Sequence, residues 1–247
     1  MPCDRGDASF PRPAVNNGNR SEATPGIAPQ TAAHEIEEFL GSGQGAARRR
    51  FTYHDQCQLL IDWARSTQRI LDADKWLKPA KFGGKEHHIW FHETSQHVIK
   101  TTHSEAFGRF PEAAHNSIRL REGNIREYFH RLTLSNWLFG DSMFIVGVAL
   151  DEWEHPRIIT AQPAICGTRP GDGRVEEYFD ALGFEPTESP TIFYRSKDRL
   201  GAFDAHPGNL IESPCKTQIY AIDVVVDEVG DELARSLEAS VKEARQR

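Results

Sequence analysis

The sequence contains only four cysteines among 247 residues, and none forms a Cys-x-x-Cys pair with another. This scatter predicts neither a disulfide framework nor a structural zinc site. No apolar run approaches the roughly twenty residues that a membrane-spanning helix needs, and the N-terminus lacks the apolar core of a secretory signal. We therefore expect a cytoplasmic protein with no membrane partner.

The sequence also lacks an excess of basic residues. Lysine and arginine total 29 against 36 acidic residues, which gives a formal net charge of −7. A broad nucleic-acid-binding face would have to neutralise phosphates with clustered cations, so the composition carries no strong nucleic-acid signal. The only dense basic run, Arg48-Arg49-Arg50, fits a solvated charge run before a helix. With 38% hydrophobic residues, the chain is long enough for one medium domain or two small lobes.

Residues 1–50 are rich in small and polar side chains and predict a disordered leader, with a short helix at Thr31 to Leu40. Residues 51–163 predict a small α+β lobe. Its expected elements are a helix from a Thr52/Asp55 capping pair to about Leu71, a hairpin of residues 87–91 and 97–100, a loop, a helix over residues 124–139, and strands over residues 143–149 and 157–162.

A proline- and glycine-punctuated connector, Gln162 to Gly173, predicts a hinge. Residues 164–226 then form an abbreviated second lobe. They predict a helix over residues 175–182 and strands over residues 191–195, 200–203 and 220–226. Residues 227–247 predict a charged helix with a narrow apolar stripe. The expected architecture is a two-lobed α+β fold.

The segment from Asp204 to Asn209 and the later Asp223 carry the most informative chemistry. Phosphoryl transfer needs a group that orients the accepting hydroxyl and hard oxygen ligands for Mg²⁺. Asp204 suits the first task, and Asn209 and Asp223 suit the second. Asp204 and Asn209 alone also fit a turn between strands. Asp223 is harder to explain as structure, because an unpaired carboxylate in an apolar strand is costly.

Two residues earlier in the chain complete the set. Lys100 ends an apolar strand and would project its cation towards the phosphates of a nucleotide. Glu127, on the following helix, would hold Lys100 by an ion pair. Taken singly, Lys100 also fits a strand-end lysine at the surface, and Glu127 also fits a partner of Arg131 at i+4.

The chain resembles the protein-kinase-like superfamily in the order of these residues. A strand lysine comes first and a helix glutamate second; a loop aspartate with an asparagine five residues later follows, and a second aspartate comes last. With Gly83-Gly84, Leu138 to Asp141 and Gln162-Pro163 added, the chain is similar to the polyvalent protein kinase domain of phages and conjugative elements. The resemblance implies a kinase-like fold and a site for ATP and Mg²⁺. It also implies nucleotide contacts from Gly83, Gly84 and Lys100, from the backbone around Gln162 and Pro163, and from His206, which alternatively supports the loop backbone.

The sequence departs from ordinary protein kinases in two places. Gly83-Gly84 is shorter than a full glycine loop. About twenty residues follow Val226, too few for the helical lobe on which peptide substrates dock. We therefore expect phosphoryl transfer from Mg-ATP to a hydroxyl acceptor, protein or small molecule. Two alternatives are a non-catalytic interaction module of a mobile-element protein and a nucleotidyl transferase on the same fold.

Overall fold

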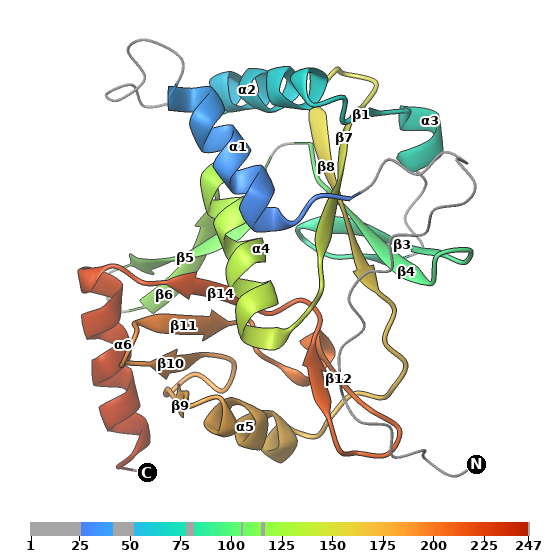
Figure 1. Ribbon diagram of the computed structural model, residues 1–247. Helices are drawn as coiled ribbons and strands as arrows, with labels where there is room; N and C mark the ends of the chain where they lie inside the picture. Colours follow the sequence, from blue (N-terminus) through green and yellow to red (C-terminus); the bar gives the residue numbers. More distant parts are fainter. Residues whose placement is uncertain (1–25, 42–51, 78–81, 105, 115–116, 247) are drawn as a thin grey trace.

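The computed structural model describes residues 26–41, 52–77, 82–104, 106–114 and 117–246. Figure 1 shows two regions stacked along the long axis of the molecule, with helix α4 (Ile125–Phe139) between them. The upper region is built on a six-stranded sheet, and the lower region on a four-stranded sheet with a separate two-stranded ribbon. The mixed helix and strand content that the sequence predicts is confirmed.

The upper sheet has the strand order β1-β7-β8-β4-β3-β2. β1 runs parallel to β7, and the other neighbours in this sheet are antiparallel. In this register Lys100 on β4 lies between Ile89 of β3 and Thr160 of β8. The strands are β1 (Ile70–Leu71), β2 (Phe82–Gly83), β3 (His87–His92), β4 (His97–Thr102), β7 (Phe144–Leu150) and β8 (Pro156–Pro163).

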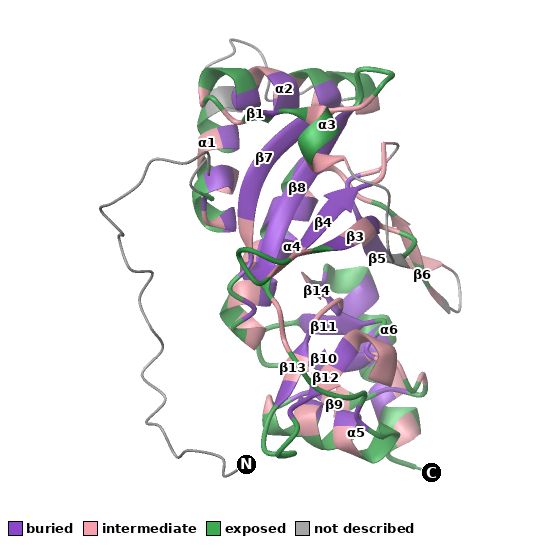
Figure 2. Cartoon of the chain, turned by 90° about the vertical axis from the view of Figure 1, so that its right-hand side faces the viewer, coloured by how far each residue is buried: buried purple, intermediate pink, exposed green. Residues whose placement is uncertain are grey.

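Helices pack on both faces of this sheet. On one face, α1 (Pro29–Gly41), α2 (Tyr53–Ser66) and α4 form a core with Ile145, Val148 and Ile158 of the two central strands. On the other face, the short α3 (Ala73–Trp76) places Trp76 against Trp90, with ring centroids 6.1 Å apart. Figure 2 shows β7 and β8 buried along most of their length. Because β4 pairs with β8, Lys100 is held on a rigid support.

The sequence marks the ends of α2 and α4. Thr52 and Asp55 form a reciprocal capping box at the start of α2, as predicted. Asn124 and Glu127 form the same box at the start of α4. α4 ends at Gly140, whose φ of 69° lies in the left-handed region that glycine adopts at little cost. α2 ends at Ser66, earlier than the predicted Leu71, because residues 70 and 71 join the sheet as β1.

The lower region contains a four-stranded antiparallel sheet in the order β14-β11-β10-β9. Helix α5 and the ribbon β12-β13 pack on one face, and α6 packs on the other. The predicted apolar stripe is buried as expected: Leu233, Leu237 and Val241 lie on α6, and Val229 lies just before the helix, which begins at Asp231. The elements are α5 (Asp172–Ala181), β9 (Glu185–Pro186), β10 (Phe193–Arg195), β11 (Leu200–Phe203), η2 (Pro207–Asn209), β12 (Leu210–Glu212), β13 (Ile219–Ala221), β14 (Val225–Glu228) and α6 (Asp231–Ala244).

Two segments differ from the sequence prediction. The loop expected before α4 contains a hairpin of β5 (Arg109–Ala114) and β6 (Ser117–Glu122), which packs against α6. The predicted disordered leader includes α1, whose residues Ala32 and Ile36 are buried against α4. The helix that the sequence places near Thr31 to Leu40 is therefore confirmed, while residues 1–25 and 42–50 of the leader lie outside the described residues. Within the described residues, no helix is both long enough and apolar enough to cross a membrane.

Candidate active site

Lys100 reaches from the upper sheet to the lower region of the molecule. Its Nζ donates a hydrogen bond to the carbonyl oxygen of Ile222 and lies 3.4 Å from Oδ1 of Asp223. The lysine side chain is 9% exposed, so its charge is largely removed from water. A desolvated cation needs opposing charge or dipoles nearby, and Lys100 finds both in the segment after β13. Within the part of the chain that the structure describes, Asp223 is its ion-pair partner.

Asp223 lies in the bend between β13 and β14, and not within one continuous strand as the sequence suggests. Its side chain is consequently 40% exposed and can meet a ligand from solvent. Burial raises the pKa of Asp223, but the charges of Lys100, His87 and Arg131 outweigh burial and hold the pKa below its usual range. The carboxylate is therefore ionised at neutral pH, as a metal ligand must be.

The loop after β11 presents Asp204 and Asn209 together. Asp204 has a φ of 54°, an unusual value that aspartate tolerates better than most residues. The Nδ2 of Asn209 donates to the carbonyl oxygen of Asp204 at 2.8 Å and to its Oδ2 at 3.0 Å. The Asp204 side chain is 51% exposed, so its carboxylate can be reached from the surface. This arrangement leaves Asp204 able to accept a proton from an approaching hydroxyl.

His206 supports this loop from within. Its Nδ1 accepts a hydrogen bond of 3.0 Å from the backbone N–H of Gly208, which caps the turn η2. Because Nδ1 accepts, the proton of the neutral ring is on Nε2, which lies 3.6 Å from Oδ1 of Asp204. This hydrogen bond is the backbone support that the sequence suggested for His206; the phosphate contact stays a prediction.

Asp204 and Asp223 are joined through backbone hydrogen bonds. The N–H of Ile222 donates to the carbonyl oxygen of Asn209 at 2.9 Å, and the carbonyl oxygen of Ile222 accepts from Lys100. A continuous chain of hydrogen bonds thus runs from Lys100 through Ile222 and Asn209 to Asp204. Lys100 is thereby connected to Asp204 and Asn209, predicted site residues more than one hundred positions later in the sequence, and the fourth, Asp223, is its ion-pair partner.

The donor set near Asp223 fits a magnesium ion shared with a nucleotide. Asn209 uses Nδ2 in hydrogen bonds, which leaves its amide Oδ1 for a cation, and Asp223 offers an ionised carboxylate. Mg²⁺ prefers hard oxygen ligands and is usually held by one or two protein groups plus phosphates and water. The described residues contain no cluster of three or more His, Cys, Asp or Glu side chains that could hold a metal alone. A metal here would therefore depend on the nucleotide.

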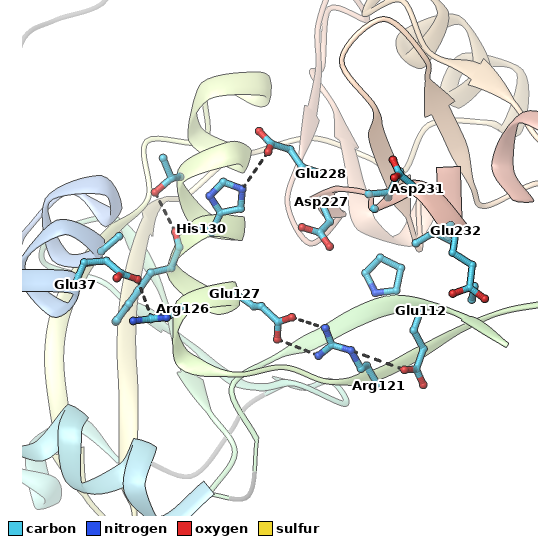
Figure 3. A pocket seen from close by; sticks show the side chains of 18 of the residues that line it. Glu37, Glu112, Arg121, Arg126, Glu127, His130, Asp227, Glu228, Asp231 and Glu232 are labelled. Atoms are coloured by element: carbon cyan, nitrogen blue, oxygen red, sulfur yellow. Dashed lines mark hydrogen bonds and ion pairs between the residues drawn. The ribbon is translucent and has the colours of Figure 1, made fainter. Parts of the chain in front are cut away.

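Glu127 does not form the ion pair with Lys100 that the sequence predicts, so this assignment is wrong. Figure 3 shows Glu127 turned towards Arg121, in a groove of about 820 Å³ bordered by α1, α4, the β5-β6 hairpin and the start of α6. Glu127 binds Arg121 through both carboxylate oxygens and accepts the N–H of Asn124 at 2.8 Å. Its side chain is used to cap α4, while Lys100 lines a different cavity.

A buried charged network occupies the face of α4 that turns towards Lys100. Arg131 binds Glu86 through two hydrogen bonds of 3.1 and 2.7 Å, so it is not the i+4 partner of Glu127. His87 lies 3.0 Å from the hydroxyl of Tyr128, and both side chains are buried. Burial lowers the pKa of His87 to about 4, which keeps the ring neutral at physiological pH. This network fixes the β2-β3 connection against α4.

A second carboxylate near Lys100 was missed at the sequence level. Asp141 follows the end of α4, is 9% exposed, and accepts a hydrogen bond from Ser135 Oγ. It lines the same small cavity as Lys100, Asp223 and Ser135, with a volume of about 20 Å³, room for roughly one water molecule. The signal in the sequence is an acid directly after a helix-ending glycine, in front of a buried strand.

Two predicted nucleotide contacts lie at the edges of this region. Gly84 is in the tight β2-β3 connection. Its N–H donates a hydrogen bond to the backbone carbonyl oxygen of His87, and its own carbonyl oxygen lies 3.0 Å from Nε2 of His103. A side chain at Gly84 would meet no atom within 4 Å, so the loop faces open space. Gln162 is the last residue but one of β8, and its buried side-chain nitrogen has no hydrogen-bond partner in the described structure. Pro163, next to it, is exposed and has no N–H to donate.

Comparison with known families gives one match. A family model described as a serine/threonine/tyrosine kinase found in polyvalent proteins matches residues 53–227. The chain belongs to this family. The matched range includes most of both regions of this chain. It also includes the site residues Lys100, Asp204, Asn209 and Asp223. Comparisons with curated proteins and with solved structures gave no match.

Proposed function

We propose that this kinase-family protein is a phosphotransferase that binds Mg-ATP between its two regions and transfers the γ-phosphoryl group to a hydroxyl. In this proposal residues 51–163 are the N-terminal lobe, residues 164–226 are an abbreviated C-terminal lobe, and residues 227–247 are a helical tail. The acceptor is a hydroxyl of a protein or of a small molecule.

The observation that supports the proposal best is the hydrogen-bonded chain from Lys100 to Asp204. Phosphoryl transfer requires a cation at the phosphates, metal ligands beside it and an acid that orients the attacking hydroxyl. Lys100, Ile222 and Asn209 are joined in series, with Asp223 3.4 Å from Lys100 and Asp204 3.0 Å from Asn209. A turn that served only to link strands would not need a buried lysine from a different sheet.

Each residue then has one role. Lys100 binds the phosphates, Asn209 and Asp223 hold Mg²⁺, and Asp204 orients the acceptor and takes its proton. Magnesium would supply charge neutralisation at the phosphates. The adenine would lie near the end of β8, at the backbone around Gln162 and Pro163, where the side-chain nitrogen of Gln162 is without a hydrogen-bond partner in the described structure. Gly83 and Gly84 would let the β2-β3 connection approach the phosphates.

The proposal is tested with ATP that carries label at either the α- or the γ-phosphate, in the presence of Mg²⁺. The wild-type chain is compared with Asp204→Asn and Asp223→Asn. We expect transfer of γ label to the protein itself or to an added hydroxyl acceptor, with loss in both variants by at least a hundredfold. Binding of Mg-ATP should persist in Asp204→Asn, because Asp204 is not a ligand of the nucleotide in this scheme.

The other outcomes have definite meanings. Transfer of α label would identify a nucleotidyl transferase that uses the same lysine and metal ligands. Binding of ATP without transfer of either label would favour a non-catalytic kinase-like module. Failure of the wild-type chain to bind Mg-ATP would refute the proposal.

A further inference from the structure

The proposed reaction leaves Lys100 in need of a second carboxylate. In the structure its charge is balanced by Asp223, at 3.4 Å, and by the carbonyl dipole of Ile222. If Asp223 turns to Mg²⁺, the lysine loses its ion-pair partner inside a site where the side chain is 9% exposed. The phosphates would then attract Lys100 from one side only, so a further acid beside the lysine would hold its ammonium group in place in the nucleotide-bound form. Glu127 cannot supply it, because it is bound to Arg121.

Asp141 is placed to do so. Its carboxylate and Lys100 line the same cavity of about 20 Å³, together with Ser135 and Asp223. The described structure contains no ion pair from Asp141, whose hydrogen bond is with the neutral hydroxyl of Ser135. The positive charge of Lys100 acts on the Asp141 carboxylate and favours its ionised form. Arg131 also lines the cavity but is engaged by Glu86, so it does not compete for Asp141.

The backbone around Asp141 is held from both sides. Gly140 ends α4 in the left-handed conformation and turns the chain sharply. The side-chain amide of Asn136 then bonds both the N–H and the carbonyl oxygen of Met143, each at 2.8 Å. Asp141 is therefore fixed between the last turn of α4 and the start of β7. Its position depends on rigid elements and not on a mobile loop.

We propose that Asp141 is the residue that positions Lys100 when the nucleotide is bound, the part that the sequence had assigned to Glu127. This inference rests on the proposed function, since it concerns how Lys100 meets the phosphates. Asp141 acts through Lys100 and does not touch the reacting atoms.

The test is a double-mutant cycle read by the dissociation constant of Mg-ATP, measured by calorimetry on the full chain. The variants are Asp141→Asn, Lys100→Met and the double variant, with Glu127→Gln as a matched control. The measurement is made at pH 8, because burial raises the pKa of Asp141 to about 6 and the carboxylate is then ionised. Asparagine keeps the shape of the side chain and an oxygen that can accept from Ser135.

We expect Asp141→Asn to weaken Mg-ATP binding about tenfold. The variant loses one charge–charge attraction at an effective dielectric constant near 20, and water around Lys100 replaces part of that attraction. Glu127→Gln should change it less than twofold. In the Lys100→Met background, Asp141→Asn should have no further effect. Asp141→Glu, which restores the charge, should recover part of the affinity and guards against a fold defect in the asparagine variant.

Three results would overturn the inference. Wild-type affinity in a folded Asp141→Asn protein shows that the carboxylate is not needed. An equal loss in the wild-type and Lys100→Met backgrounds shows that Asp141 acts on the fold and not through Lys100. A larger loss in Glu127→Gln than in Asp141→Asn returns the role to Glu127. If Mg-ATP does not bind even the wild-type chain, the proposed function fails first and this inference fails with it, a result distinct from the other three.

Discussion

Replacing Arg131 with methionine should destabilise this protein severely. Arg131 and Glu86 are joined by two charged hydrogen bonds, and their side chains are only 7% and 13% exposed. Arg131 also donates to the carbonyl oxygen of Arg109 at 3.1 Å and lies over the rings of Phe110 and Tyr128. Methionine would retain part of this packing but leave the Glu86 carboxylate buried without its cation.

The magnitude follows from that orphaned charge. Removing one partner of a buried pair costs about 3–5 kcal/mol, against a total stability of about 5–15 kcal/mol for a typical domain. Glu86 keeps one hydrogen bond from the N–H of Arg109, at 2.9 Å, which places the expected loss near the lower end, about 3 kcal/mol. The double variant Glu86→Gln/Arg131→Met should lose less than the sum of the two single variants, because no buried charge remains unpaired.

Urea unfolding at pH 7 and at pH 4 tests this reasoning. Burial raises the pKa of Glu86, but Arg131 outweighs burial and holds the pKa below its ordinary value. The stabilisation is therefore complete above the pKa of the unfolded chain, roughly 4.3, and is lost as pH falls through the lower folded value. The gap between wild type and Arg131→Met should narrow in acid. A loss below about 1 kcal/mol at pH 7, or strict additivity of the two substitutions, would refute the account.

Three further predictions concern single positions. The pKa of His87 is about 4 in the folded chain against 6.5 when unfolded. The wild type should therefore lose about 3 kcal/mol of unfolding free energy relative to His87→Gln as pH falls from about 6.5 to 4. The same difference between the two proteins in urea unfolding at both pH values would contradict this. Gly140→Ala should lower stability by about 1 kcal/mol in thermal melts. A Cβ there meets nothing within 4 Å, so the cost comes from the φ of 69° and not from a clash, and Gly140→Asn should lose less stability. Glu127→Ala should lower stability by about 1 kcal/mol through loss of the cap of α4, and an unchanged melting temperature would argue against that role.

The elements that the sequence predicts well are those in which local pattern and tertiary role agree. α4 has apolar residues at helical spacing, a cap at Asn124 and a terminating glycine at Gly140. The β3-β4 hairpin has two apolar runs separated by a polar turn. The β5-β6 hairpin was missed because Gly108, Pro111 and Gly123 read as loop residues. Proline is acceptable in that hairpin because, among the described strands, β5 and β6 form a two-stranded sheet in which each strand is an edge strand.

The loop part of the site was also predictable. Asp204 and Asn209 are five positions apart, so a single tight turn brings them into hydrogen-bond contact whatever the rest of the chain does. Joining that turn to Lys100 is a different matter. It requires the bend at Asp223, and sequence reasoning drew this segment as one strand because apolar residues flank the acid on both sides. β14 begins at Val225 because that residue pairs with Phe203 of β11, a contact between residues distant in sequence.

The misassigned helix glutamate shows how local chemistry competes with a functional pattern. Asn124 and Glu127 have the spacing of a capping box, in which the acid turns back to the start of its own helix. A carboxylate used in this way points along the helix axis and cannot also reach a lysine across the sheet. Glu127 is also on the wrong face of α4: it lines the groove beside Arg121, whereas Tyr128, Ser135 and the following Asp141 line the cavity that contains Lys100. An acid that is to balance Lys100 must therefore line this cavity, and Asp141, just after α4, is an acid that does so.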